Sequence, residues 1–217
     1  MTSVSLPKYS IGVGDRFAQQ AKAQLSACIL AAQEGVEVIP VWNKSNREHV
    51  IVGSEPSSAR KAADEAVKSL GWDKPYFVDA DHIGFETAER FLEPCDFFTI
   101  DVADRIGQAA ARESVQDFLD RHAEFSGPLR IPGVEGSLPV DRDFVAVVVN
   151  EYLAAVQEAA RIYRHIEERK GRGAFIAEIS MDETESPQTP LELLIILAAI
   201  ADNEIPIQTI APKFTGR

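Results

Sequence analysis

Tyr76-Phe-Val-Asp-Ala-Asp-His-Ile-Gly84 is an apolar run of strand length that leads directly into two carboxylates and an imidazole. The same order recurs at Phe97-Phe-Thr-Ile-Asp101-Val-Ala-Asp104 and at Phe175-Ile-Ala-Glu178-Ile-Ser-Met-Asp-Glu183. Ionisable groups at the ends of several strands are typical of open α/β sheets and (β/α) barrels, because the carboxyl ends of parallel strands and the loops after them form one polar face. These segments therefore predict both an α/β fold and the place of a site.

Along the whole chain, strand-length apolar runs alternate with longer segments of helical period. Strands are predicted at 9–13, 36–41, 76–78, 97–100, 174–179 and 207–210, and helices at 16–33, 57–70, 85–91, 108–124, 141–169 and 190–203. Asp141 is a candidate N-cap, and Thr189-Pro190 begins the last helix in a similar way. Six strand–helix units predict a TIM-barrel-like (β/α) domain over residues 1–217, two units short of a closed barrel and truncated at its C-terminus.

One segment interrupts this alternation. Residues 126–138 hold three glycines and two prolines, which predicts an ordered but irregular loop between two helices. A surface connector and an active-site flap both fit such a loop.

Composition limits the classes of function. The chain has 217 residues, of which 45% are hydrophobic, enough to bury one substantial core. Its formal net charge of −12 argues against nucleic-acid or anionic-membrane binding, which needs a basic face. Two cysteines give no disulfide framework, and no apolar stretch suggests a signal peptide or a membrane span. A cytoplasmic location is therefore expected.

Asp79, Asp81 and His82 are the first candidate site residues. Alternate residues of a strand share a face, so mutual repulsion between the two carboxylates should raise the pKa of one of them or require a cation. His82 can bind a divalent metal while Asp81 serves as a base, although a structural histidine is the plainer alternative. Asp101 is a weaker candidate, because capping of the next helix would also explain it.

Glu178 lies inside an otherwise apolar strand, where an unpaired charge would be costly. A salt bridge would satisfy it, but a pocket-facing acid with a raised pKa is the favoured interpretation. Cationic, amide and carboxylate side chains near other strand ends suit a polyhydroxylated, carboxylate-bearing ligand. The candidate substrate contacts are Arg16, Asn43, Lys44, Arg47, Asp101, Asp182 and Lys213.

Other site signatures do not occur in the sequence. Gly12-Val-Gly14 lacks the third glycine of a dinucleotide fingerprint, and there is no phosphate loop, nucleophile elbow or zinc-type cysteine spacing. Hydride chemistry with a nucleotide cofactor is therefore not expected.

Several long motifs carry a family resemblance over nearly the whole chain. They are Lys8-Tyr-Ser-Ile-Gly-Val-Gly-Asp-Arg-Phe17, Pro40-Val-Trp-Asn-Lys-Ser-Asn-Arg-Glu-His49, Val78-Asp-Ala-Asp-His-Ile83, Phe98-Thr-Ile-Asp-Val-Ala-Asp104, Glu178-Ile-Ser-Met-Asp-Glu-Thr184 and Thr209-Ile-Ala-Pro-Lys-Phe-Thr-Gly-Arg217. The sequence resembles the tagaturonate/fructuronate epimerases, metal-dependent enzymes of a (β/α) barrel fold that interconvert two keto-hexuronates.

The resemblance implies roles for individual residues. His82 matches a metal ligand, Asp81 a proton acceptor and Glu178 a proton donor, and Lys213 and the basic loop after the second strand match substrate contacts. The cofactor would be a divalent cation such as Mn²⁺, Ni²⁺ or Zn²⁺, with further histidine ligands expected beyond residue 217. The partner would be a small keto-hexuronate, and a homo-oligomer is left open.

The chemistry favours a retro-aldol route, because the inverted carbon lies β to the ketone and its hydrogen is not acidified. Asp81 would remove the hydroxyl proton at that carbon, the metal would act as a Lewis acid on the enediolate, and Glu178 would return the proton. An aldolase or ketose isomerase on the same scaffold is one alternative. A non-catalytic fragment that only binds sugar acids is the other.

Overall fold

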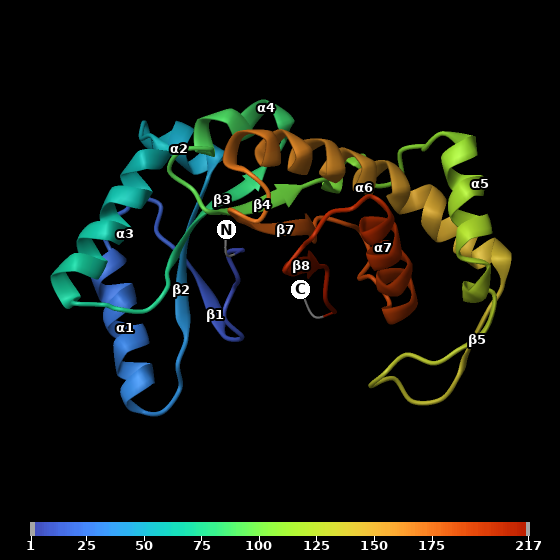
Figure 1. The fold of residues 1–217 in the computed structure, drawn as a ribbon, viewed down its shortest axis with the longest axis horizontal. Coiled ribbons are helices and arrows are strands. Elements are labelled where there is room, and N and C mark those ends of the chain that lie inside the picture. Colours follow the sequence, from blue (N-terminus) through green and yellow to red (C-terminus); the bar gives the residue numbers. More distant parts are fainter. Residues whose placement is uncertain (1–2, 216–217) are drawn as a thin grey trace. The chain divides into compact units, whose positions relative to one another are not determined.

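The computed structural model describes residues 3–215 and has an α/β fold, as the sequence predicts. The strands are β1 (Ser10–Gly14), β2 (Ile39–Ser45), β3 (Phe77–Ile83), β4 (Phe97–Asp101), β5 (Gly127–Leu129), β6 (Leu138–Val140), β7 (Ile176–Met181) and β8 (Thr209–Pro212). The α-helices are α1 (Ala21–Gln33), α2 (Asn46–Val52), α3 (Pro56–Leu70), α4 (Phe85–Ala88), α5 (Arg112–Arg121), α6 (Arg142–Lys170) and α7 (Pro190–Asp202), and short 3₁₀ turns follow α4, β4 and α5. Figure 1 shows these elements in chain order.

The chain divides into two compact units, each built from three segments. The first comprises Met1–Asp101, Ile162–Ile179 and Ile207–Thr209, and the second comprises Val102–Arg161, Ser180–Pro206 and Ile210–Arg217. The prediction of one barrel-type domain over residues 1–217 stays a prediction.

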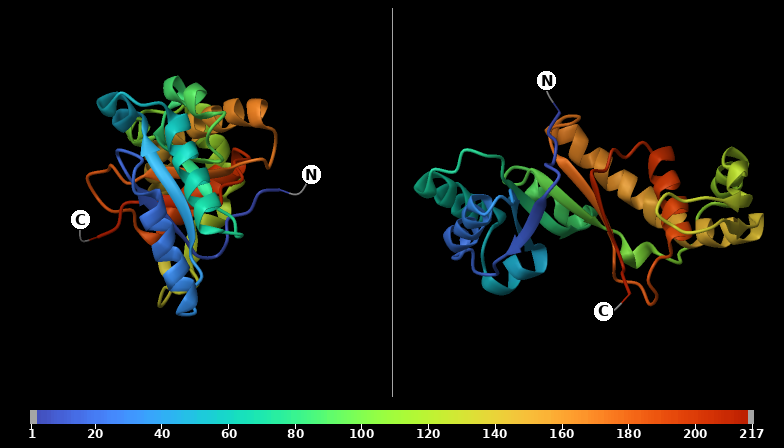
Figure 2. Two further views of the ribbon diagram at one scale, coloured as in Figure 1. Left: turned by 90° about the vertical axis from the view of Figure 1, so that its left-hand side faces the viewer. Right: turned by 90° about the horizontal axis from the view of Figure 1, so that it is seen from below.

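The structure has a six-stranded sheet with the order β1-β2-β3-β4-β7-β8, whose strands β1 to β4 belong to the first unit. The strands from β1 to β4 pair in parallel, as the alternation of strands and helices predicts. Helices α1, α2 and α3 pack against β2 and β3, and α1 and α3 lie side by side on one face of the sheet in every view (Figures 1 and 2). Helices on a face of a parallel sheet explain why these strands are rich in apolar residues.

The strands run further toward their carboxyl ends than the sequence predicts. β2 continues to Ser45 and β3 to Ile83, through the polar residues that were expected to lie in the following loops. The helix expected at 16–33 begins only at Ala21, because Asp15 accepts hydrogen bonds from the backbone N–H groups of residues that precede the helix. Polar side chains on a strand interrupt the apolar pattern but not the backbone hydrogen bonding, which is why the pattern ends too early.

One helix and two short strands were missed altogether. Asn46–Val52 forms α2, whose N-terminus has a capping box: Ser45 accepts from the N–H of Glu48, and Glu48 accepts from the N–H of Ser45. The segment expected to be irregular, 126–138, contributes to an antiparallel pair of β5 and β6. Both strands belong to the second unit, which also contains α5, α7 and the part of α6 up to Arg161.

Two predicted helix starts are confirmed. Asp141 accepts a 2.7 Å hydrogen bond from the N–H of Phe144 at the start of α6. Thr189 and Glu192 form a capping box at the start of α7. In the described part of the chain, no helix combines the length and apolar character needed to cross a bilayer.

A buried apolar cluster lies on the sheet face opposite the helices α1 and α3. It consists of alternate residues from four strands: Ile39, Val41, Phe77, Phe97 and Ile176. The partly buried side chains Val4, Leu6 and Trp72 pack against this cluster. The cluster lies near the amino ends of these strands, and the polar groups described next follow it along the same strands.

Candidate functional site

A layer of polar side chains lies one step beyond the apolar cluster along the same strands. Two residues after Val41, Phe77, Phe97 and Ile176 come Asn43, Asp79, Thr99 and Glu178. Because side chains two apart in a strand share a face, these four groups belong to the same side of the sheet as the cluster. The register of β2 against β3 places Asn43 opposite Asp79 and Ser45 opposite Asp81.

Three of these groups are joined by hydrogen bonds across β3, β4 and β7. The N–H of Thr99 donates to Asp79 Oδ1 at 3.1 Å, and Thr99 Oγ1 lies 2.9 Å from Asp79 Oδ2. The same hydroxyl lies 3.3 Å from Glu178 Oε1. The sequence placed Asp79 and Glu178 near strand ends but did not single out Thr99, which connects them.

Asp79 is the deepest acid of the layer, with 6% of its surface exposed. Burial raises the pKa of this carboxyl well above its usual range, and the negative charges of Asp81 and Glu178 raise it further, while hydrogen bonds from Thr99 oppose the shift. The expectation that repulsion from Asp81 would raise one pKa is confirmed, although burial is the larger cause.

Asp81 and His82 lie at an irregularity of β3. The register between β3 and β4 shifts between Ala80 and Ile83, and His82 has a φ of 51°, in the left-handed region. This backbone turns His82 outward, so that 38% of its side chain is exposed, while 19% of the Asp81 side chain is exposed. Bulges of this kind re-aim side chains next to active sites, and a left-handed residue other than glycine is strained.

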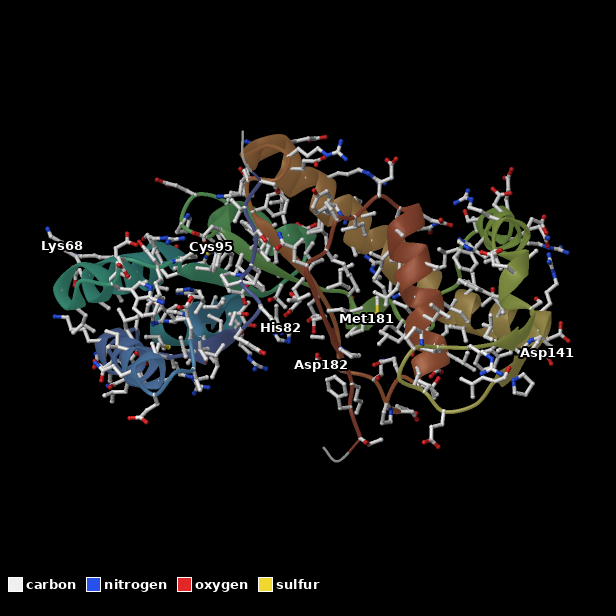
Figure 3. All side chains as sticks on the ribbon, turned by 60° about the horizontal axis from the view of Figure 1, so that its bottom comes forward. Lys68, His82, Cys95, Asp141, Met181 and Asp182 are labelled. Atoms are coloured by element: carbon white, nitrogen blue, oxygen red, sulfur yellow. The ribbon has the colours of Figure 1, made fainter. Side chains whose placement is uncertain are left out.

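The two side chains bond to each other. His82 Nδ1 lies 2.7 Å from Asp81 Oδ1. Figure 3 labels His82 and Cys95, two residues of the first unit, among the side chains. A carboxylate bonded to one ring nitrogen fixes the orientation and tautomer of an imidazole, which prepares the other nitrogen for a metal or a substrate.

Asn43 sits over the edge strand β1. A Cβ atom added at Gly14 would come within 3.1 Å of Asn43 Oδ1, so the glycine makes room for the amide. That oxygen is buried and has no hydrogen-bond partner in the described structure. An unsatisfied buried acceptor in a polar layer is where a ligand hydroxyl or a water molecule would be expected to bind.

The remaining basic candidates of the first unit lie elsewhere. Lys44 follows Asn43 and therefore points to the helix-covered face, where it is 2% exposed and donates to Ser54 Oγ at 2.9 Å. Arg16 is exposed and forms a 3.4 Å ion pair with Glu48, and Arg47 is exposed on α2. The structure thus does not bring these cations to the polar layer, and their role as substrate contacts stays a prediction.

Asp101, Asp182 and Lys213 complete the sequence-predicted set. Asp101 ends β4 in the first unit. In the second unit, Asp182 accepts a 2.9 Å hydrogen bond from Ser180, and the ammonium of Lys213 donates to the carbonyl of Thr184. Lys213 is thereby tied to the acidic loop that follows β7, and its backbone N–H donates to Gln188 Oε1 at 2.6 Å.

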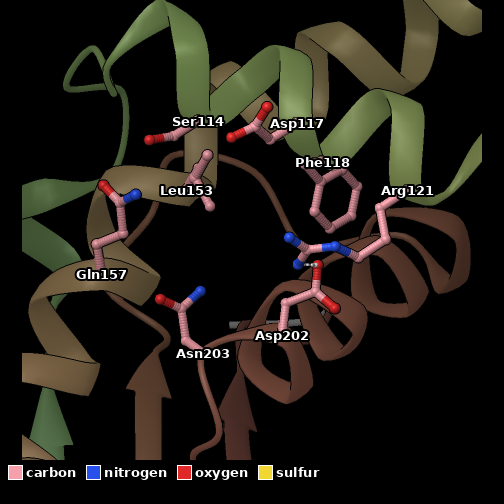
Figure 4. Close-up of a pocket in the computed structure, with 8 residues that line it drawn as sticks. All are labelled: Ser114, Asp117, Phe118, Arg121, Leu153, Gln157, Asp202 and Asn203. Carbon is pink, nitrogen blue, oxygen red and sulfur yellow. Dashed lines mark hydrogen bonds and ion pairs between the residues drawn. The ribbon is translucent and has the colours of Figure 1, made fainter.

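Pockets occur among the described residues of the second unit. One, of about 370 Å³, is bordered by the loop after β7 and lined by carboxylates that include Glu151, Glu183 and Glu185. The other pocket, of about 200 Å³, lies among α5, α6 and α7 (Figure 4). Two residues that line it, Arg121 and Asp202, form an ion pair of 2.7 Å. No residue that the sequence singled out lines this second pocket, and its strongest charges neutralise each other.

Metal binding was predicted for His82, and the described residues do not form a complete site for a metal ion. Among residues 3–215, no group of three or more His, Cys, Asp or Glu side chains is arranged to hold a metal ion. The pair of His82 and Asp81 has the arrangement of an imidazole ligand with its orienting carboxylate, but one such pair is an incomplete ligand set.

The fold and this layer define an α/β protein whose acids lie on one face of a parallel sheet, near the carboxyl ends of its strands. The model of the tagaturonate epimerase family matches residues 2–217, and the chain belongs to that family. The resemblance seen in the sequence is thereby confirmed. No match is found among curated proteins.

Solved structures agree on the fold. A glycerol complex of the fructuronate-tagaturonate epimerase from Cohnella laeviribosi has a TM-score of 0.78 and 23% sequence identity, and the match covers 96% of this chain. The native crystal structure of that enzyme gives a TM-score of 0.73 at 22% identity. In both cases this chain spans 44% of the length of the solved chain.

Proposed function

We propose that this chain supplies the acid–base groups of an epimerase that interconverts D-tagaturonate and D-fructuronate. The observation that carries the proposal is the family match over residues 2–217. It is supported by the polar layer, in which carboxyl groups from two strands face one side of the sheet at the depth where strand-end chemistry is usually placed. The complete fold would be a (β/α) barrel, of which the six-stranded sheet is a part.

In the proposed reaction Asp81 is the base and Glu178 is the acid. Asp81 takes the hydroxyl proton at the inverted carbon, and the bond from that carbon to the carbon next to the ketone breaks. The hydroxyl becomes an aldehyde, and the electron pair of the broken bond remains on the ketone fragment as an enediolate. The aldehyde rotates, the bond forms again on its other face, and Glu178 protonates the new alkoxide.

A divalent cation would supply Lewis-acid stabilisation of the developing negative charge. We assign His82 as one of its ligands, oriented by Asp81. The other ligands would come from residues outside this pair. The substrate would be a small keto-hexuronate in the cytoplasm.

A proton NMR time course tests this function. Purified chain is incubated with fructuronate, with and without Mn²⁺, Ni²⁺ or Zn²⁺, and the expected result is metal-dependent appearance of tagaturonate. Asp81→Asn and Glu178→Gln should each slow the reaction by about 100-fold or more, since general acid–base catalysis contributes factors of that size. Exposed Lys68 on α3 provides the control Lys68→Gln, which should keep the rate.

Other outcomes separate the alternatives. Cleavage products would indicate an aldolase, and exchange of the hydrogen on the carbon next to the ketone would indicate a ketose isomerase. Binding of fructuronate without turnover, alongside an active longer family member, would indicate a fragment that only binds sugar acids. Deuterium incorporated on the inverted carbon in deuterium oxide would contradict the retro-aldol route.

A further inference from the structure

The hydroxyl of Thr99 lies between two carboxyl groups and carries a single hydrogen. Its Oγ1 is 2.9 Å from Asp79 Oδ2 and 3.3 Å from Glu178 Oε1. A hydroxyl can donate one hydrogen bond, so a second bond at the same oxygen requires that the other partner be the donor. An ionised carboxylate has no hydrogen to give. If both contacts are hydrogen bonds, one of the two carboxyl groups is protonated.

Burial decides which group carries the proton. Asp79 is 6% exposed, whereas Glu178 is only partly buried. The hydrogen-bond partners of the Asp79 carboxyl in the described structure are the N–H and the hydroxyl of Thr99, so no cation compensates a charge there. An uncompensated buried charge is far more costly than a neutral acid.

The other ionisable groups near Asp79 act in the same direction. Asp81 on the same strand and Glu178 on β7 are both acids whose negative charge disfavours a second one, and the thiol of Cys95, before β4, is buried. The charges of Asp81 and Glu178, together with burial, raise the pKa of Asp79, while the hydrogen bonds from Thr99 oppose the shift.

We propose that Asp79 is a neutral acid that positions Glu178 through the hydroxyl of Thr99. Asp79 donates its hydrogen to Thr99 Oγ1, and Thr99 donates its own hydrogen to Glu178 Oε1. The N–H of Thr99 donates to the free oxygen of Asp79 and closes a ring of two hydrogen bonds. Asp79 is a positioning residue, because it acts on Glu178 and does not touch the reacting atoms.

In the proposed epimerase, on which this inference rests, the bond from Thr99 determines which oxygen of Glu178 can act as the acid. With Oε1 of Glu178 occupied as an acceptor, Oε2 is the oxygen left to carry the proton when Glu178 acts as the acid toward the alkoxide. The carboxyl group is thus held in one of its two orientations before substrate arrives, which is the pre-organisation that general acid catalysis requires.

Infrared spectroscopy at neutral pH tests the protonation state without any turnover. Wild-type protein should show the carbonyl band of a protonated carboxylic acid. The band should disappear in Asp79→Asn and persist in Glu178→Gln and Asp81→Asn. Protein labelled with carbon-13 at the aspartate side-chain carboxyl should show the same band shifted to lower frequency. This measurement assigns the band to an aspartate even if Asp79→Asn does not fold.

Thr99→Val tests the positioning step. The carboxylate band that Glu178→Gln removes identifies Glu178, and this band should shift in Thr99→Val because its hydrogen-bond donor is lost. Asp79→Asn should keep the thermal midpoint and the Glu178 band close to wild type, because its amide can donate to Thr99 Oγ1 as the neutral acid does. A merely structural role of Thr99 would leave the Glu178 band in place.

The results that overturn the proposal are distinct from a failure of the epimerase. An acid band that vanishes in Glu178→Gln, an acid band that ignores the aspartate label, or no acid band at all would each reject a neutral Asp79. If no turnover is found but the bands behave as expected, the proposed function falls, and the neutral Asp79 with its link to Glu178 through Thr99 stands.

Discussion

Asp79 and Asp81 are both aspartates and lie two positions apart on β3, but the structure gives them different surroundings. Asp79 lies directly beyond the apolar cluster, bonded to Thr99 and covered on all sides, while Asp81 lies where the strand loses its regular pairing and bonds to His82. Pairs of carboxyl groups whose environments push their pKa values apart commonly divide acid and base roles between them. Two positions along β3 therefore separate the buried carboxyl group that we propose as a neutral acid from the less buried one that we propose as a base.

The left-handed backbone at His82 should be detectable as strain. With φ at 51°, any residue with a Cβ atom is disfavoured, so His82→Gly should be more stable than His82→Ala by about 1 kcal/mol. Both variants lose the imidazole, and their difference therefore isolates the backbone. Urea denaturation of the two variants, followed by circular dichroism, measures it.

Ala80, two residues earlier on β3, provides the matched control. It is fully buried in the regular part of the strand, so Ala80→Gly should lower the free energy of unfolding by about 0.5–1 kcal/mol. Equal stability of His82→Gly and His82→Ala would show that the bulge does not hold residue 82 in this conformation.

At the scale of elements, the order of strands and helices could be predicted from periodicity, but the ends of the strands could not. Asn43, Lys44 and Ser45 look like a loop because they are polar, yet they continue β2, since Asn43 faces the polar layer and Lys44 is buried and bonded to Ser54. The role of Thr99 was missed for a different reason. A threonine between Phe98 and Ile100 reads as an ordinary strand residue, and only the step of two from Phe97 indicates that it faces the site.

Helix α2 is attached to β2 through a buried polar group that should make stability depend on pH. Lys44 and His49 Nδ1 both bond to Ser54 Oγ, at 2.9 and 3.0 Å. Burial, together with the positive charges of Lys44 and Arg90, lowers the pKa of His49 from 6.5 to about 4. The imidazole is therefore neutral in the folded protein at neutral pH.

The sign of the effect follows from linkage. The pKa of His49 is lower in the folded state, so its contribution is fully present above pH 6.5 and is lost as pH falls toward 4. The full loss corresponds to about 3 kcal/mol of unfolding free energy. Urea denaturation across this range should show the decline in wild type and a smaller decline in His49→Asn, whose amide oxygen can replace Nδ1 as the acceptor.

His165→Gln serves as the control, because the imidazole of His165 is more accessible and lies beside Glu89. This variant should keep the wild-type decline between pH 6.5 and 4. A decline of equal size in His49→Asn would mean that carboxyl groups, and not His49, determine the pH dependence in this range.

At the scale of the whole molecule, the net charge of −12 keeps like-charged chains apart and protects an otherwise vulnerable sheet edge. β1 is the first strand in the order of the six-stranded sheet, and its neighbourhood exposes apolar side chains: Tyr9 is 59% and Ile11 49% exposed. Edge strands with apolar side chains are templates for pairing with other chains unless charge or bulges block them. Because Tyr9 and Ile11 themselves carry no charge, we expect the overall charge of the chain to oppose pairing at this edge.

This protection should disappear as the net charge approaches zero. On lowering the pH from neutral toward the isoelectric point of about 4.8, the apparent mass of the wild-type protein should rise in light-scattering measurements. Ile11→Lys places a charge on the edge and should reduce the association severalfold at each pH. Val147→Lys, an equally large change at an exposed position of α6, is the control and should associate as the wild type does. If Ile11→Lys and Val147→Lys associate to the same extent, the charge of the chain matters but the β1 edge is not the surface through which copies meet.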